Sequence, residues 1–222
     1  MKAMILAAGR GERMRPLTDH CPKPLLSVAG KSLIEYHIAA LVRAGVSQIV
    51  INIAWLGAKI KQQLGDGQHY GVEILYSDEG DQALETAGGI INALPLLGQE
   101  PFILVNGDIW TDYNFSQLPS TLTNKLAHLV LVENPEHHPQ GDFDLDQAGL
   151  VLDQPAYTYS GIAVYSPALF TNLKQGVRPL SPLLRLAMQQ QQVSGECYTG
   201  DWWDVGTPQR LTELEAFITK KQ

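Results

Sequence analysis

The first residues of the chain restrict its fold more than any other segment. The apolar run Met4-Ile5-Leu6 ends in the small residues Ala7-Ala8, and a loop bearing Gly9 and Gly11 follows at once. A short apolar run bounded by glycine is typical of a buried strand. Glycine has no Cβ, so the backbone N–H groups of such a loop can come close to a ligand. We therefore expect a strand at residues 3–6 that leads into a ligand-binding loop.

Basic residues in and after this loop indicate an anionic ligand. Arg10, Arg13 and Arg15 lie in the loop and Lys23 follows, and such side chains form charge-assisted hydrogen bonds to phosphate oxygens. Residues 1–31 hold six basic and two acidic side chains, whereas the whole chain has a net charge of −7. One basic region on an acidic protein favours a small polyanion, such as a nucleoside triphosphate, over a nucleic acid.

Two common phosphate-binding loops do not match the segment. The dinucleotide-binding pattern G-x-G-x-x-G requires a glycine where Met14 stands, which disfavours a nucleotide-dependent dehydrogenase. The P-loop pattern G-x-x-x-x-G-K-[ST] occurs nowhere in the chain. Gly9-x-Gly11 alone could also form an ordinary strand-to-helix turn, so the prediction of nucleotide binding depends on its combination with Arg13, Pro16-Leu17-Thr18 and Pro22-Lys23-Pro24.

The first half of the chain alternates apolar runs with amphipathic stretches, which predicts an α/β fold with a mostly parallel sheet. Ser32 and Glu35 have the spacing of a capping box before the first helix, and Gly45 suits its end. The expected strands are 3–6, 48–53, 72–76 and 102–105, and the expected helices are 33–44, 55–64 and 86–94.

The second half predicts short strands that add to the sheet in antiparallel fashion. Thr207 and Pro208 are suited to begin a C-terminal helix. The expected strands are 127–132, 143–145 and 159–165, and the expected helices are 167–173, 182–192 and 208–220.

Four motifs resemble those of the sugar-1-phosphate nucleotidylyltransferases, in the same order along nearly the whole chain. They are Leu6-Ala7-Ala8-Gly9-x-Gly11-x-Arg13-Met14-x-Pro16-Leu17-Thr18 with Pro22-Lys23-Pro24-Leu25, then Glu85-Thr86-Ala87-Gly88-Gly89, Val105-Asn106-Gly107-Asp108 and Trp203-Asp204-Val205-Gly206-Thr207. The resemblance implies an enzyme that joins a sugar 1-phosphate to a nucleoside triphosphate and releases pyrophosphate. It also implies a Rossmann-like, glycosyltransferase-A-like mixed sheet in a single domain, 1–222. Its nucleotide-binding half would be 1–110 and its sugar-phosphate-binding half 111–222.

Two aspartates far apart in the sequence are the expected metal ligands. Asp108 follows a strand and a glycine, so its side chain can project into a cleft, where hard carboxylate oxygens suit Mg²⁺. Asp204 lies among apolar residues, where an unpaired carboxylate is costly to bury. Alone, either could cap a turn or form an ion pair. The resemblance implies that they share one Mg²⁺.

The resemblance also implies the roles of the other site residues. Arg13 would clamp the triphosphate and Lys23 the reacting phosphates, and these two with Asp108 are the expected catalytic residues. A phosphate monoester is already ionised at neutral pH, with a second pKa of ~6. In-line displacement at the α-phosphorus would then rest on positioning and charge neutralisation. The expected nucleotide-binding residues are Leu6, Ala8, Gly9, Gly11, Arg13, Lys23, Gln82 and Gly88.

The expected substrate-binding residues are Asn106, Glu133, Gly141, Gly161 and Asp204. Relatives often have a Glu-Lys-Pro segment whose lysine reaches the substrate phosphate. Here Asn134 replaces that lysine, so the contact is lost or made elsewhere.

Residues 137–143 and the short chain resemble most the N-acetylmuramate-1-phosphate uridylyltransferases of cell-wall recycling, which implies UTP as the nucleotide. The lactyl carboxylate of that acceptor requires a cation, and Arg178 and Arg185 are the candidates. A mannose-1-phosphate guanylyltransferase or a glucose-1-phosphate thymidylyltransferase stays open. So does a non-catalytic nucleotide-sugar-binding protein, although such a protein is expected to lose the metal aspartates or the loop basics.

Composition and the N-terminal sequence indicate in which compartment the protein is expected to act and which partners it is expected to lack. No run approaches the ~20 apolar residues of a membrane span, and the N-terminus lacks the pattern of a signal peptide. We expect a cytoplasmic protein with no membrane or nucleic-acid partner, acting as a monomer or a small homo-oligomer. Cys21 and Cys197 have no metal-ligand spacing.

Overall fold

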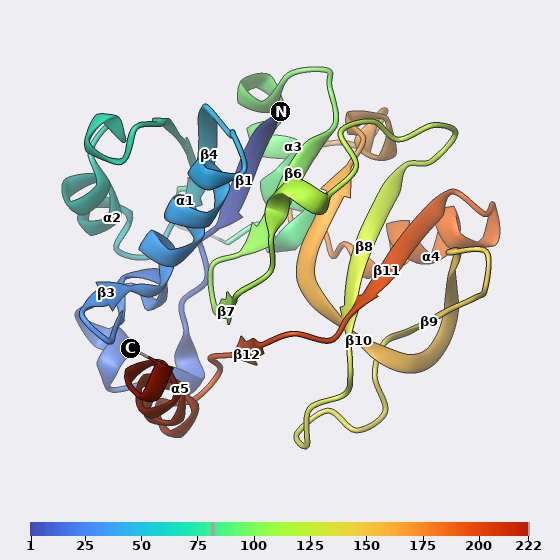
Figure 1. Cartoon of the computed structure of the whole chain (residues 1–222). Coiled ribbons are helices and arrows are strands. Elements are labelled where there is room, and N and C mark those ends of the chain that lie inside the picture. The colour runs from blue at the N-terminus through green and yellow to red at the C-terminus, as the bar shows by residue number, and fades with distance from the viewer. Residues whose placement is uncertain (81–82, 222) are drawn as a thin grey trace.

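A computed structural model describes residues 1–80 and 83–221 and has a mixed sheet at its centre (Figure 1). The strand order is β11-β8-β10-β6-β1-β4-β5, and β9 pairs with β10. The strands are β1 Lys2–Leu6, β4 Gln48–Ile53, β5 Glu73–Asp78, β6 Phe102–Asn106, β8 Ala127–Val132, β9 Phe143–Leu145, β10 Val151–Tyr165 and β11 Val193–Tyr198.

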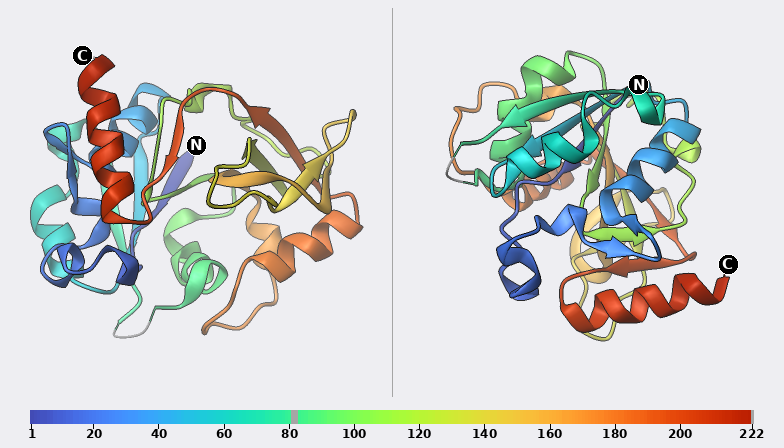
Figure 2. Two further views of the ribbon diagram at one scale, coloured as in Figure 1. Left: turned by 90° about the horizontal axis from the view of Figure 1, so that it is seen from below. Right: turned by 90° about the vertical axis from the view of Figure 1, so that its left-hand side faces the viewer.

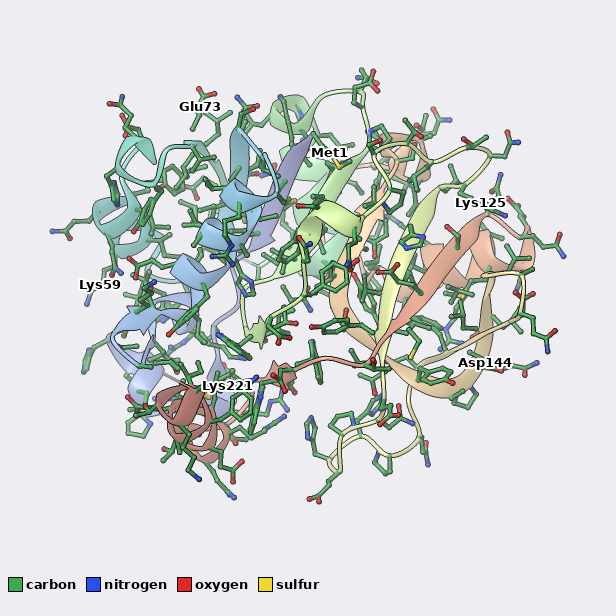
Figure 3. The ribbon with its side chains drawn as sticks, in the orientation of Figure 1. Met1, Lys59, Glu73, Lys125, Asp144 and Lys221 are labelled. Atoms are coloured by element: carbon green, nitrogen blue, oxygen red, sulfur yellow. The ribbon has the colours of Figure 1, made fainter. Side chains whose placement is uncertain are left out.

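The directions of the strands confirm the expected mostly parallel, mixed sheet. β1 pairs in parallel with both β4 and β6, and β4 pairs in parallel with β5. β10 runs antiparallel to β6 and β8, and β11 is parallel to β8. In Figure 3, Met1 and Glu73 mark the end where β1 and β5 begin, and Lys221 on the last helix lies toward the other end. The carboxyl ends of the parallel strands therefore meet on one side, where open α/β sheets bind ligands.

Helices cover both faces of the sheet (Figure 2). In β1, Ala3 and Ile5 face one apolar cluster and Met4 faces the other, because successive side chains of a strand point to opposite sides. α1 and α2 contribute to the first cluster, and α3 and α4 to the second. The helices are α1 Leu33–Arg43, α2 Gly57–Leu64, α3 Glu85–Leu97, α4 Ser181–Gln189 and α5 Pro208–Lys221.

The expected ends of the helices are largely confirmed. The Ser32 N–H donates to Glu35 Oε2 at 2.9 Å, as the capping box requires, and Gly45 has a φ of 82° just past the end of α1. Thr207 Oγ1 accepts the Arg210 N–H at 3.3 Å at the start of α5. Among the described residues, no helix is both long and apolar enough to cross a membrane.

A third apolar cluster joins the two ends of the chain. Leu214 and Ile218 of α5 pack with Met14, Val28 and other residues that follow the N-terminal loop, and Figure 1 shows α5 beside this segment. Two small antiparallel sheets flank the cluster. They are β2 Ser27–Val28 with β3 Lys31–Ser32, and β7 Ile109–Thr111 with β12 Trp202–Asp204.

The second half differs from expectation in three places. The helix expected at 182–192 ends at Gln189, because β11 begins at Val193 and pairs along β8. The helix expected at 167–173 is a single 3₁₀ turn, Pro167–Phe170. β10 starts at Val151, eight residues before the expected strand, because its first part pairs with β9.

Candidate active site

The carboxyl ends of β1, β4 and β6 surround a cavity of about 230 Å³, here called the first cavity. Six of the expected site residues line it together: Leu6, Ala8, Gly9, Lys23, Asn106 and Asp108. The structure thus brings the N-terminal loop and the Asp108 motif to one place, as the resemblance implied.

Lys23 and Asp108 form an ion pair in the wall of the first cavity, with 2.7 Å between Lys23 Nζ and Asp108 Oδ2. The Lys23 side chain is only 10% exposed, whereas that of Asp108 is 41% exposed. Gly107 sets the position of Asp108, because a Cβ there would lie 2.5 Å from the Leu6 carbonyl oxygen. The Gly107 N–H donates to that same oxygen at 2.9 Å. The pair therefore sits where β1 and β6 end side by side.

The loop arginines differ in how they are engaged. Arg10 donates to the Thr18 carbonyl oxygen at 2.8 Å and stacks on Trp55, with its guanidinium carbon 3.7 Å from the ring centroid. Arg10 and Arg15 both pair with Asp19. Arg13 is exposed and makes no hydrogen bond or ion pair within the described residues. Of the three arginines, Arg13 is therefore the one not already committed to the loop.

Gly11 belongs to the scaffold of this loop rather than to the wall of the first cavity. Its φ is 66°, and an added Cβ would lie 3.0 Å from Thr18 Cγ2 and 3.2 Å from Lys23 Cβ. The Thr18 hydroxyl donates to the Gly11 carbonyl oxygen at 2.8 Å. A left-handed conformation in so tight a space favours glycine, and the resulting turn holds Lys23 close.

A buried polar network behind the loop was not predicted from the sequence. Asn52 is 4% exposed; its Oδ1 accepts the Ala7 N–H at 2.8 Å, and its Nδ2 donates to Glu79 Oε1 at 2.6 Å. Glu79 Oε2 in turn accepts the Leu84 N–H at 2.8 Å, just before α3. The signal that could have identified Asn52 is its place as a polar residue near the carboxyl end of an apolar strand.

Of the two expected metal ligands, Asp204 ends β12 and Asp108 immediately precedes the paired strand β7, but they face different partners. The Val205 N–H donates to the Asp108 carbonyl oxygen at 2.9 Å, so the two aspartates are near neighbours across β7 and β12. Asp204 Oδ2 accepts from Arg210 Nη1 at 2.6 Å and lies 3.2 Å from His137 Nε2. Asp204 does not line the first cavity, and no group of three or more potential metal ligands occurs among the described residues.

The donor chemistry of this pair nevertheless fits Mg²⁺. Within the described part of the chain, Asp108 Oδ1 makes no hydrogen bond, while Oδ2 accepts from Lys23. Mg²⁺ is usually bound by one or two carboxylates together with substrate phosphates and waters, rather than by a complete protein cage. Two neighbouring carboxylates, one of which lines the first cavity with the glycine loop, meet that requirement.

Four other expected residues, Gly88, Gly161, Gly141 and Glu133, lie outside the first cavity. Gly88 packs on the segment before α4, because an added Cβ would lie 2.3 Å from the Gly176 carbonyl oxygen. Gly161, with a φ of 81°, packs on Asn106. Gly141 packs on Asn134, and Glu133 is exposed. Gln82 lies outside the described residues.

Asn134, which stands where relatives often have lysine, holds its own loop together. Its Oδ1 accepts the Thr158 hydroxyl at 2.8 Å, and its Nδ2 donates to the carbonyl oxygens of Ala156 and Pro139 at 2.8 and 3.1 Å. A side chain with these bonds is committed to the loop between β8 and β9.

A second cavity of about 440 Å³ adjoins the first and shares Glu85, Thr86 and Asn106 with it. Glu85 begins α3 with a φ of 57°, a left-handed conformation that is strained for a residue with a side chain. The far wall of this second cavity includes Asp142 and Arg185. Two joined cavities suit a reaction with two substrates.

Comparison with known proteins agrees with this geometry. The nucleotidyl transferase family model matches residues 2–221. An N-acetylmuramate alpha-1-phosphate uridylyltransferase of Neisseria meningitidis is 54% identical, over 97% of both chains. One of Caulobacter vibrioides is 35% identical, over 98% of this chain and 97% of its own.

A solved structure from Bacillus anthracis, described as a glucose-1-phosphate thymidylyltransferase in complex with sucrose, has the same fold. Its TM-score is 0.85 at 21% identity, and the match covers 98% of this chain and 94% of that one. Motifs, architecture and family match coincide over nearly all of the sequence, and the chain belongs to the nucleotidyl transferase family.

Proposed function

We propose that the protein transfers a uridylyl group from UTP to N-acetylmuramate 1-phosphate, forming UDP-N-acetylmuramate and pyrophosphate. The observation that carries the proposal is the pair of joined cavities. One is walled by the glycine loop and the Lys23–Asp108 pair, and the other by α4, β9 and β10. Two relatives that match over 97% of their own lengths, at 54% and 35% identity, are N-acetylmuramate alpha-1-phosphate uridylyltransferases, and their names support the choice of nucleotide and sugar.

In this mechanism, the chain's residues position phosphates and neutralise their charge. Lys23 places a nearly buried ammonium at the first cavity, where it would hold the reacting phosphates, and the uncommitted Arg13 would clamp the triphosphate. The sugar phosphate needs no general base, since its oxygen is ionised at neutral pH. Charge neutralisation and alignment then supply most of the catalysis.

Asp108 and Asp204 would hold the metal ion. Bound Mg²⁺ would supply additional positive charge at the phosphates. Asp204 is kept in place by Arg210. Asn106, shared by both cavities, would contact the substrate between them, and Gly161 would fix its side chain.

Further aspects of the proposal follow from the same reaction. Residues 1–110 would bind the nucleotide and residues 111–222 the sugar phosphate, within one domain. The protein would act in the cytoplasm, where nucleoside triphosphates are available, as a monomer or small homo-oligomer. Its product would serve cell-wall recycling.

A pyrophosphate-release panel tests the proposal. UTP, dTTP, GTP, CTP and ATP are each combined with the 1-phosphates of N-acetylmuramate, N-acetylglucosamine, glucose and mannose, with Mg²⁺ present. UTP with N-acetylmuramate 1-phosphate should give the highest kcat/KM. If no pairing reacts, the enzymatic function is refuted, and if UTP reacts only with unsubstituted hexose phosphates, the muramate assignment is refuted.

A further inference from the structure

The second cavity has one cationic side chain in its wall, as far as the described residues show. Arg185 of α4 lines it together with Asp142, Phe143, Tyr159 and Ser181, and Glu85 stands at the side shared with the first cavity. In Figure 3, Asp144 marks β9, the strand that begins at Phe143. An acceptor with a second anionic group would therefore meet a single positive charge here.

The Arg185 side chain is oriented by three neighbours. Nε donates to Ser181 Oγ at 3.2 Å, one turn earlier on α4, and Nη1 donates to Asp153 on β10. The guanidinium carbon lies 5.8 Å from the Phe143 ring centroid. A guanidinium has five N–H donors, and Nη2 makes no hydrogen bond within the described part of the chain. Arg185 is thus held in place while the N–H donors of Nη2 stay available.

The acidic neighbours leave this cation available to a ligand. Asp142 is occupied, because its Oδ1 lies 3.1 Å from His138 Nε2 and its Oδ2 accepts the Tyr159 N–H at 2.9 Å. The Arg185 side chain is 47% exposed and that of Asp153 is 30% exposed. A pair so open to water is weakly coupled, so Asp153 positions the guanidinium without preventing a second carboxylate from binding.

Arg178, the other candidate cation, is placed differently. Its backbone N–H donates to the Leu84 carbonyl oxygen at 2.9 Å, and its own carbonyl oxygen accepts the N–H groups of Ala87 and Gly88. Arg178 does not line the second cavity. These backbone contacts fix the start of α3. Arg185 is the candidate for recognition of an acceptor anion because it lines the second cavity and Arg178 does not.

We infer that Arg185 determines acceptor specificity by binding the lactyl carboxylate of N-acetylmuramate 1-phosphate. The inference rests on the proposed function and adds the residue that selects the sugar. N-acetylglucosamine 1-phosphate is the same molecule without the lactyl group, so it lacks the partner of Arg185 and otherwise makes the same contacts. The guanidinium acts on binding and is remote from the reacting phosphorus, so its contribution belongs in KM rather than in kcat.

The test compares both sugar phosphates in steady-state assays at saturating UTP. N-acetylglucosamine 1-phosphate is measured as a substrate or, if it is not turned over, as a competitive inhibitor. Arg185→Gln should raise KM for N-acetylmuramate 1-phosphate about 10- to 100-fold, the value of one charge-assisted hydrogen-bonded contact. KM or Ki for N-acetylglucosamine 1-phosphate should change less than about twofold, because its contacts are untouched.

Two further variants complete the design. Arg185→Lys keeps the charge but loses the planar fork, so it should recover part of the lost affinity. Arg43→Gln, at an exposed position of α1, is the matched control and should behave as wild type. The inference is overturned if Arg185→Gln weakens both sugar phosphates equally, or neither. If wild-type protein reacts with other pairings in the panel but not with N-acetylmuramate 1-phosphate, the proposed function itself has failed.

Discussion

The Lys23–Asp108 pair should respond unequally to the loss of its two members. Both single substitutions delete the same 2.7 Å contact, yet the surviving partner differs. Asp108→Ala leaves an ammonium that is nine-tenths shielded from water, whereas Lys23→Met leaves a carboxylate that water already reaches. Because the cost of breaking a pair lies mainly in the charge that is left uncompensated, Asp108→Ala should destabilise the protein more.

The exposed fractions set the size of this difference. An uncompensated charge in a fully buried pair costs about 3–5 kcal/mol, while losing an exposed pair costs about 0–1 kcal/mol. Lys23 borders an open cavity, so we expect about 2–3 kcal/mol for Asp108→Ala. Methionine preserves much of the Lys23 stem, so Lys23→Met should cost less than about 1 kcal/mol. At about 2–4 °C per kcal/mol for a chain of this size, the two variants should differ by roughly 4–8 °C in Tm.

Urea denaturation without metal or nucleotide measures both variants and their combination. The double variant Lys23→Met/Asp108→Ala should be nearly as stable as Lys23→Met alone, because removing the ammonium also removes the uncompensated charge. This gives a coupling energy of about 2 kcal/mol in the double-mutant cycle. Equal losses in the two single variants, or strictly additive losses in the double variant, would refute the argument from burial.

Three other predictions address the site and its surroundings. Asp108→Asn and Asp204→Asn should each lower kcat by about two orders of magnitude or more, because an amide keeps the shape but not the charge that binds Mg²⁺. Asp108→Asn should also lower Tm, since it leaves the Lys23 ammonium without its partner; full activity in either variant would remove that residue from the metal site. Burial lowers the pKa of His37 to about 4 from 6.5, so the unfolded chain binds this proton between pH 6.5 and 4 and the folded chain does not. As the pH falls from 6.5 to 4, the free energy of unfolding should therefore decrease by up to about 3 kcal/mol. The prediction fails if His37→Gln shows the same pH dependence of stability as the wild type. Gly107→Ala would bring a Cβ to 2.5 Å from the Leu6 carbonyl oxygen, so calorimetry should show that the free energy of unfolding is lower by about 1–3 kcal/mol. A wild-type Tm would mean that the ends of β1 and β6 can move apart to make room for the methyl group, and would refute the prediction.

The parallel half of the fold could be predicted because its signals are local. Apolar runs, helical periodicity and the capping box before α1 all lie within a few residues of the element they specify. The second half lacked such signals. β11 includes Ser194 and Gly195 and is extended because β8 lies beside it. β7 and β12 are three residues each and depend on pairing across most of the chain. Long-range pairing overrides weak local preference.

The candidate site could likewise be predicted only where its residues lie within a local sequence motif. Residues within recognisable motifs, such as Lys23 and Asp108, meet as expected. Asn52 stands outside every motif, and its role arises because β1 and β4 are adjacent. The contact of Asp204 with Arg210 and His137 joins α5 to the loop after β8. Spacing in the sequence carries no information about such a contact.

The packing of α5 against the N-terminal segment has a consequence for how the protein is made. Met14, at the end of the loop's first 3₁₀ turn, is fully buried in the cluster that Leu214 and Ile218 complete. Translation proceeds at ~5–20 residues per second, so a nascent chain carries the loop for roughly ten to forty seconds before α5 exists. During that time Met14 cannot yet pack against Leu214 and Ile218 of α5. The proposed nucleotide site can therefore be completed only after α5 has been synthesised, although the loop that begins it is among the first residues made.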